Sequence, residues 1–428
     1  MRYLSLVFAA LVITGCGDSE SVAPPVQQDP APVGYQYSQS NMPRDVQPQV
    51  SSAAFEQLID NNNDFALRLY QWQAENDENL FFAPMSVSLA MAMSYAGARQ
   101  QTATEMATAL NFQLPDEQLH SAMNKLLLQL HDTAATGDYP ITFNLTQASW
   151  LEQSYVVLPE YLDLLAVHYD AGVHQIDFKE QPDKARATIN NWVAEQTEGK
   201  LSELLAEGSV TADTRLMLLN TMFFKANWAQ PFKPADTQQV DFFPLNGSTV
   251  QVPMMQRDAV RTLYAEGAGY QVIRLAYANQ QFAMLVLVPS EGNFIAFEAE
   301  LNLDRLQQIR QQLSEHLVDL TLPKFQLQHQ LNLKSVLQDF GMQEAFQPGS
   351  ADFSGIDGTQ SLFIGSAVHQ AVIDVDEYGT EAAAATAVEM GVTSAPPPAA
   401  LTVNRPFIYL IEEQGTGAIL FMGRFLEP

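Results

Sequence analysis

Apolar residues in the first half of the chain repeat with a helical period. Positions 55, 58, 59, 65, 66, 69 and 70 are apolar, which is the spacing of one face of an amphipathic helix. A second helix is predicted to begin at Pro84, because proline suits a first helical turn, and to run towards Tyr95. A third is predicted around Trp192 and ends near Gly199, which suits the left-handed turn after a helix.

The second half of the chain is strand-like. Its β-branched and aromatic residues predict strands at 272–275, 282–288, 317–325, 368–376, 407–411 and 418–425. Helices come first, strands come later, and few βαβ alternations occur. This order predicts an α+β fold built on antiparallel sheets.

One segment near the C-terminus fits two structures. Alanine is the best helix former, so the alanine-rich run in 379–400 predicts a short helix followed by a loop. The same residues also alternate as a strand with one buried face does. One alternate set is small or apolar and the other carries the charges: Thr380, Ala382, Ala384, Thr386, Val388 and Met390 against Glu381, Ala383, Ala385, Ala387 and Glu389. Small side chains suit a strand that enters between packed neighbours.

The N-terminus has the features of an export signal. A basic Arg2, an apolar run over 4–13 and small residues predict a signal peptide over 1–15, too short to span a membrane as a mature helix. The order apolar, small, Gly, Cys is similar to the bacterial lipobox, so acylation of Cys16 and a lipid anchor in the membrane are expected. An ordinary signal with an incidental cysteine is the alternative. Gly17 stands where inner-membrane retention signals have Asp, which favours an outer-membrane lipoprotein, periplasmic or surface-exposed.

The mature chain divides into a tether and one domain. Residues 16–50 are rich in Pro, Gln and Ser and poor in large apolar residues, which predicts a disordered tether. Residues 51–428 contain no second linker and no repeat, so they are expected to form one large domain. Cys16 is the chain's one cysteine, so the domain has no disulfide.

Charge and motifs argue against several classes of function. The net charge of -28 argues against nucleic-acid partners. The seven histidines form no HExxH pair, and no GxSxG elbow, phosphate-binding glycine loop or catalytic cysteine occurs. The segment 352–358 lacks the acidic spacing of a calcium loop and is interpreted as a surface turn. We therefore expect no enzyme, metal or cofactor.

A series of ordered motifs resembles the serpins, a family of serine protease inhibitors. In chain order they are 79–86 (NLFFAPMS), 189–193 (INNWV), 220–228 (NTMFFKANW), 252–255 (VPMM), 322–325 (LPKF), 376–382 (DEYGTEA), 405–407 (RPF) and 421–424 (FMGR). The similarity covers essentially 51–428. It implies a large central, mostly antiparallel sheet, two smaller sheets, about eight or nine helices and an exposed reactive loop.

The resemblance implies a suicide inhibitor whose bait is the loop from Glu377 to about Ser394. A serine protease would cut this loop, form a covalent complex and be trapped when the loop inserts into the sheet. Inhibitory serpins have Gly, Thr and small residues at the hinge, and this chain matches at Gly379, Thr380, Ala382, Ala383, Ala384 and Ala385. The expected hinge also includes Glu381 and Thr386. Family spacing places the scissile bond at Thr393-Ser394, with Met390 to Val392 left open. These residues are uncharged, so elastase-like, subtilisin-like or chymotrypsin-like targets are expected.

The resemblance also assigns roles to residues outside the loop. Ser86, Asn220 and His369 are expected to form the hydrogen-bonded cluster that governs sheet opening. Glu377 and Lys324 are expected to pair at the top of the sheet, near Trp228. Two residues depart from the family pattern: Ala83 replaces Ser, and Ala226 replaces Gly.

The resemblance also bears on the expected partners. Basic residues are sparse in 121–138, so no heparin-like activator is expected, and the protein is expected to be a monomer. The alternatives are a non-inhibitory serpin that acts as a binding protein and a solute-binding lipoprotein.

Overall fold

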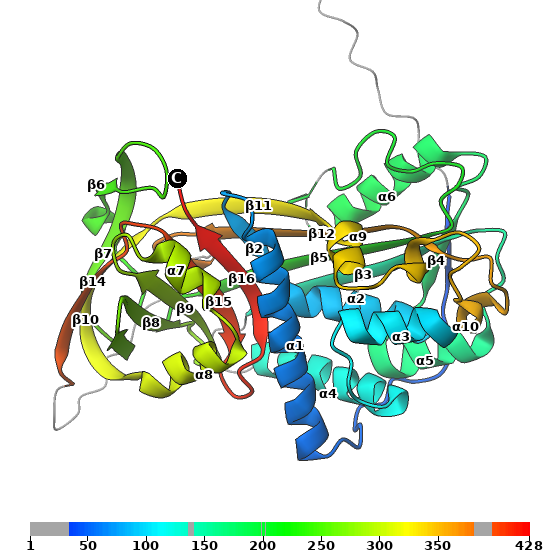
Figure 1. The fold of residues 1–428 in the computed structure, drawn as a ribbon, viewed down its shortest axis with the longest axis horizontal. Coiled ribbons are helices and arrows are strands. Elements are labelled where there is room, and N and C mark those ends of the chain that lie inside the picture. Colours follow the sequence, from blue (N-terminus) through cyan, green and yellow to red (C-terminus); the bar gives the residue numbers. More distant parts are fainter. Residues whose placement is uncertain (1–33, 136–140, 198, 202, 381–395) are drawn as a thin grey trace, which may run out of the picture.

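Long strands from both halves of the chain form two sheets in the computed structural model, which describes residues 34–135, 141–197, 199–201, 203–380 and 396–428 (Figure 1). The predicted signal peptide, the lipid attachment site Cys16, hinge residues 381–386 and the predicted scissile bond Thr393-Ser394 lie outside the described residues.

The central sheet has seven strands and is mostly antiparallel. Its spatial order is β1 (Gln36–Ser38), β4 (Val173–Ile176), β3 (Thr142–Glu152), β5 (Leu216–Asn227), β13 (Gly379–Thr380), β12 (Ile364–Val375) and β11 (Phe325–Asn332). Two pairings are parallel, β3 with β4 and β5 with β12. The β5–β12 pairing lies at the middle of the sheet and becomes the functional seam described below.

The second sheet joins the two smaller sheets that were expected. Its path is β14 (Pro398–Thr402), β10 (Ser314–Pro323), β7 (Val250–Gly267), β8 (Tyr270–Ala276), β9 (Phe282–Pro289), β15 (Phe407–Glu413), β16 (Ile419–Phe425) and β2 (Leu80–Phe82), with β6 (Gln238–Phe242) paired to β7. Strand β7 is 18 residues long and pairs with β6, β10 and β8 in turn. Strands β9, β15 and β16 are buried along their whole length, which explains their continuous apolar sequence.

Ten α-helices surround the sheets in the described residues, one more than the upper expectation. They are α1 (Ser52–Gln73), α2 (Pro84–Tyr95), α3 (Gln100–Ala109), α4 (Asp116–Ala134), α5 (Pro159–Tyr169), α6 (Pro182–Gln196), α7 (Phe294–Ala299), α8 (Leu303–Gln312), α9 (Leu333–Asp339) and α10 (Ser354–Asp357), with 3₁₀ turns at Pro234–Asp236 and Glu344–Phe346. The Ser51 hydroxyl caps α1, and α2 begins at Pro84 as predicted. The α+β class is confirmed, and so are the three helices predicted in the first half of the chain and the six strands predicted in the second. The alanine-rich run lies mostly outside the described residues. Among the residues that the structure describes, no helix has the length and apolar character needed to cross a membrane.

The segment before the domain is partly folded, which corrects the prediction of a disordered tether for residues 34–50. Strand β1 adds to the edge of the central sheet by pairing with β4. The Tyr37 ring lies 4.7 Å from that of His174, and the Tyr35 ring meets Trp150 edge-on at 5.1 Å. Further along, the Arg44 guanidinium donates to the Asn124 side chain on α4. Tyr35 and Tyr37 thus make the contacts with the sheet, although the segment as a whole is poor in large apolar residues.

We predict that Tyr37→Ala lowers the free energy of unfolding by about 1–2 kcal/mol, because the ring contact with His174 and the apolar area it covers are lost. Urea unfolding at neutral pH measures the change. Met42→Ala is the matched control, since Met42 is 52% exposed on the same segment against 45% for Tyr37. Equal unfolding midpoints for the wild type and the Tyr37 variant would show that β1 contributes nothing to stability.

Candidate functional site

The seam between β5 and β12 is closed along most of its length and open at one end. Parallel pairing runs from Leu216 opposite Ile364 to Phe223 opposite Val372. Beyond that point the two strands diverge and β13 lies between them. Thr380 pairs antiparallel with Ala226 on one side and with Val375 on the other. The first two hinge residues therefore already occupy the place of a strand.

A tight turn feeds the chain from β12 into the seam. The Asp376 carboxylate accepts hydrogen bonds from the backbone N–H groups of Tyr378 at 2.8 Å and Gly379 at 3.1 Å. The Gly379 carbonyl accepts a bond from the Asp376 N–H. A Cβ at Gly379 would lie 2.0 Å from the carbonyl oxygen of Ala226, so only glycine permits this close approach of two backbones.

Thr380 is buried and hydrogen-bonded, with 1% of its surface exposed. Its hydroxyl lies 2.9 Å from the Tyr277 hydroxyl. The Tyr277 ring stacks on Trp228 with ring centres 4.8 Å apart. Trp228 in turn donates from its indole N–H to the Asp376 carbonyl at 3.0 Å, and from its backbone N–H to the Tyr378 carbonyl. Trp228 and Tyr277 thus fix the turn and the hinge together.

The predicted ion pair at the top of the sheet is present. The Lys324 ammonium lies 2.7 Å from Glu377 Oε2, and the Thr237 hydroxyl donates to Glu377 Oε1 at 2.7 Å. Burial acts to raise the pKa of Glu377, but hydrogen bonds from Lys324 and Thr237 outweigh it and leave this pKa below its ordinary value. Glu377 is therefore ionised at neutral pH and joins the start of the loop to Lys324, which lies between β10 and β11, and to Thr237, which precedes β6.

The three residues predicted to form the sheet-opening cluster are hydrogen-bonded to one another. Asn220 and His369 are register partners across the seam, and His369 Nδ1 lies 2.6 Å from Asn220 Oδ1. The Asn220 amide donates to the backbone carbonyl of Ser86 at 2.9 Å. Ser86 takes part through its backbone carbonyl, and its buried hydroxyl has no hydrogen-bond partner among the described groups.

His369 is held neutral by its surroundings. The Ala83 backbone N–H donates to His369 Nε2 at 2.9 Å, so Nδ1 carries the proton and donates to Asn220. Full burial, with a smaller contribution from His329, lowers the pKa of His369 to about 3. Ala83 therefore holds the cluster through its backbone, which needs no serine hydroxyl.

Several of these contacts could not be predicted from the sequence. Tyr277, Thr237 and the Ala83 N–H belong to no motif that names their partners, and Gln147 donates to the Ser86 carbonyl from β3. Their positions depend on how distant strands are brought together. The familiar residues Glu377, Lys324 and Trp228, by contrast, were identified by resemblance alone.

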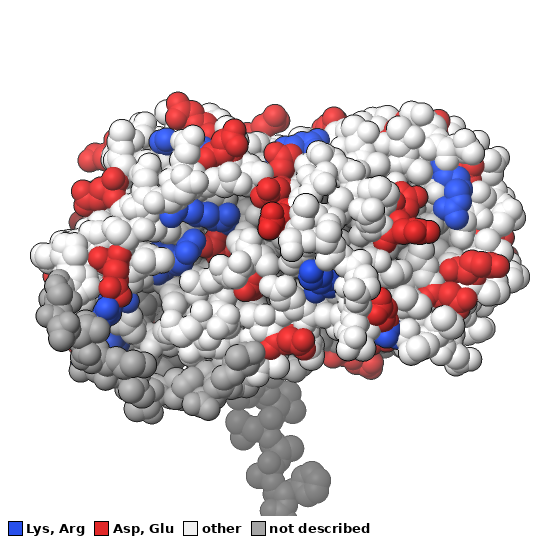
Figure 2. All heavy atoms as spheres, turned by 90° about the horizontal axis from the view of Figure 1, so that it is seen from below, with Lys and Arg blue, Asp and Glu red and all other residues white. Residues whose placement is uncertain are grey.

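The other end of the loop is anchored in the second sheet. Strand β14 pairs in parallel with β10, from Pro398 opposite Leu317 to Thr402 opposite Thr321. The loop therefore connects a hinge inside the central sheet to an edge strand of the second sheet. Figure 2 shows acidic side chains spread over both halves of the face that it draws. In the described ranges, His, Cys, Asp and Glu form no cluster suited to a metal ion.

Comparison with known proteins agrees with this architecture. Residues 60–428 match the family model described as "Serpin (serine protease inhibitor)". A serpin-like protein of Thermococcus kodakarensis is 35% identical, over 100% of this chain and 99% of its own length. The leukocyte elastase inhibitor of Homo sapiens is 34% identical, over 87% of this chain and 100% of its own. The crystal structure of human thyroxine-binding globulin complexed with its hormone superposes with a TM-score of 0.78 at 30% identity, covering 88% of this chain and 99% of that one.

The neutral state of His369 generates a pH prediction. Its pKa falls from 6.5 to about 3 in the folded protein, so below pH 6.5 the unfolded chain binds a proton that the folded chain does not. Stability from this group is complete above pH 6.5 and is lost as the pH falls towards 3, by about 1.4 kcal/mol per pH unit. We predict that between pH 6.5 and pH 5 the free energy of unfolding of the His369→Gln variant falls by about 2 kcal/mol less than that of the wild type.

Urea unfolding at the two pH values measures the difference. His131→Gln is the control, because His131 is exposed and takes no part in the cluster. A His369 variant whose stability falls with pH as steeply as that of the wild type would contradict the assignment.

Proposed function

The chain belongs to the serpin family, and we propose that it inhibits serine proteases by covalent trapping, with the loop from Glu377 to about Ser394 as bait. The observation that carries the proposal is the seam itself. Thr380 already pairs with both Ala226 and Val375, so the hinge is positioned to continue as a strand between β5 and β12.

The length of the seam matches the length of the small-residue run. Carrying the two Thr380 pairings ten residues further brings Met390 opposite Gly365 on one side and Leu216 on the other. Leu216 is the first residue of β5, and Gly365 is the second of β12. The seam thus accepts residues up to Met390, where the alternating small or apolar set also ends.

Side-chain character along the run also favours insertion. Thr380 points to the buried face, where it meets Tyr277, so the residues two, four and six positions later would face the same way. These are Ala382, Ala384 and Thr386. Insertion would replace the parallel β5–β12 pairing with two antiparallel pairings, which are slightly more stable per residue.

Insertion would also carry the protease far from its first contact. Serpins are the standard example of a reactive loop that inserts into a sheet and releases stored strain. The residues from Gly379 to Met390, at roughly 3.3 Å each, span about 40 Å, which is comparable with the size of the molecule. A protease held by an ester bond to the loop would be displaced by that distance, and its distorted site would no longer release the acyl group.

The target class and the location are further parts of the proposal. The residues from Met390 to Ser394 are uncharged, which suits elastase-like, subtilisin-like or chymotrypsin-like enzymes. A relative of 34% identity is named as an inhibitor of leukocyte elastase. Acylation at Cys16 would place the inhibitor in the bacterial cell envelope, on the outer membrane.

A non-inhibitory serpin that binds a small molecule is the second candidate. Thyroxine-binding globulin, of 30% identity, is crystallised with its hormone. The hinge favours inhibition over this role, because apart from Glu381 the chain has only Gly, Thr and Ala from Gly379 to Thr386, with no proline. A solute-binding lipoprotein of another family is inconsistent with the serpin fold.

The experiment that tests the proposal mixes the protein with pancreatic elastase, chymotrypsin and subtilisin and looks for SDS-resistant complexes. We predict a covalent complex with at least one enzyme, with the acyl bond located by mass spectrometry between Met390 and Ser394. Clean cleavage of the loop by all three enzymes without any complex would contradict inhibition.

Two matched variants extend this experiment to the insertion step. Ala384→Arg places a charge on the face that insertion would bury and should raise the inhibitor-to-protease ratio needed for full inhibition by about tenfold or more. Ala383→Arg places the same charge on the opposite face and should have a much smaller effect. Equal behaviour of the two variants would contradict strand insertion in the register of Thr380.

A further inference from the structure

A pocket of about 250 Å³ lies directly beside the hinge support. It is enclosed by the segment that follows β5, by β7 and β8, and by residues of β10 and of the turn after β15. Its lining residues are Trp228, Ala229, Gln230, Phe232, Val260 and Arg274, with nine others from the same elements.

One wall of the pocket is apolar and rigid. Trp228 and Phe232 are buried, and both are tied to the turn that precedes the hinge. The Phe232 N–H donates to the Glu377 carbonyl at 2.8 Å, as the Trp228 N–H does to Tyr378. A flat or aliphatic group placed against this wall would therefore rest on the residues that hold the loop.

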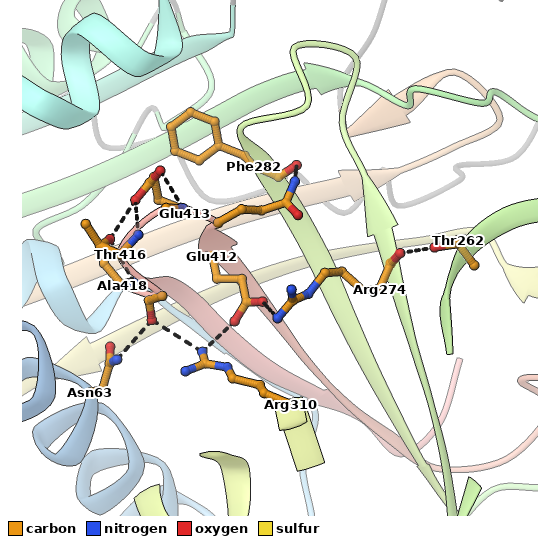
Figure 3. A network of polar contacts seen from close by, with 12 residues as sticks. Asn63, Thr262, Arg274, Phe282, Arg310, Glu412, Glu413, Thr416 and Ala418 are labelled. Atoms are coloured by element: carbon orange, nitrogen blue, oxygen red, sulfur yellow. Dashed lines mark hydrogen bonds and ion pairs between the residues drawn. The ribbon is translucent and has the colours of Figure 1, made fainter. Parts of the chain in front are cut away.

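Another wall includes an arginine that belongs to a buried charged cluster. The Glu412 carboxylate, 1% exposed, lies between the guanidinium groups of Arg274 and Arg310, at 2.6 Å and 2.5 Å (Figure 3). Two cations share one anion, and the Nε groups of both arginines have no hydrogen-bond partner among the described residues. Of these groups, Arg274 lines the pocket. The neighbouring Glu413 carboxylate is bonded instead to the backbone N–H groups of Gly415 and Thr416 and to the Thr416 hydroxyl. Arg274 and Arg310 thus share one carboxylate, in a chain whose net charge is -28.

The other charged groups that line the pocket pair with each other. At the rim, Arg261 and Glu315 form a two-bonded ion pair, with Arg261 Nε and Nη2 donating at 2.7 Å and 2.9 Å, and this pair is neutral overall. The Gln280 side chain makes no hydrogen bond to the described residues and is available to a ligand. A buried cation without a full counter-charge favours a bound anion, because its desolvated N–H groups otherwise have no partner.

We propose that this pocket binds a small organic carboxylate, with its anionic group at Arg274 and its apolar body against Trp228 and Phe232. The combination of an enclosed apolar wall and one convergent cationic group is typical of sites that hold small amphipathic anions. The site is separate from the bait loop and from the seam cluster. Its occupant contacts the two residues that support the hinge.

Isothermal titration calorimetry of the full-length protein with 3-phenylpropionate tests the proposal. The expected result is one saturable site with a dissociation constant below about 1 mM, in line with a ligand of this size. The matched neutral ligand, 3-phenylpropionamide, should bind at least about tenfold more weakly, because it keeps the apolar body and lacks the charge. Equal binding of the two ligands, or no binding of the acid below that limit, would overturn the proposal.

A variant locates the site without touching its charges. Ala229 lines the pocket, so Ala229→Leu should fill part of the cavity and weaken 3-phenylpropionate binding by about tenfold or more. Arg215→Gln removes an arginine far from the pocket lining and should leave binding unchanged. Undiminished binding to the Ala229 variant, with an unchanged unfolding midpoint, would place the ligand elsewhere and refute the assignment.

Discussion

The seam between β5 and β12 is the constraint on which the rest of the structure depends. Two long strands pair in parallel over part of their length and diverge where Gly379 and Thr380 enter between them. The chain reverses over a few residues at that entry, and the backbones approach so closely that a Cβ at Gly379 has no room. The fold thus holds a sheet that is complete at one end and prepared for one more strand at the other.

Polar contacts close this seam at its middle and at its top. Asn220 and His369 face each other across it and are tied to α2 through backbone groups of Ser86 and Ala83. Each of these bonds joins groups that would have to separate or shift if the sheet opened. The ion pair of Glu377 and Lys324 lies where the loop leaves the sheet and fixes its starting point. A few buried polar groups, each costly to leave unpaired, therefore join the strands on the two sides of the seam.

Periodicity and motifs predicted the elements well because long apolar repeats and β-branched runs are local properties of a sequence. The α1 and α2 helices and strands such as β9 and β16 follow directly from them. Three features were not predictable in this way. Residues 34–50 fold because Tyr35 and Tyr37 find aromatic partners far along the chain, and composition does not show partners. The hydroxyl pair of Tyr277 and Thr380 and the use of the Ser86 carbonyl in place of its hydroxyl depend on the angles at which distant segments meet.

The central claim is that the loop gains stability by entering the seam once it is cut, and thermal unfolding of intact and loop-cleaved protein tests this most directly. Cleavage with a protease that is not trapped, at a single bond between residues 381 and 395, would free the hinge to insert. Each inserted residue adds hydrogen bonds and buried area, so the account predicts that the unfolding midpoint rises by at least about 10 °C. A cleaved protein that unfolds at the same temperature as the intact one, or lower, would contradict it.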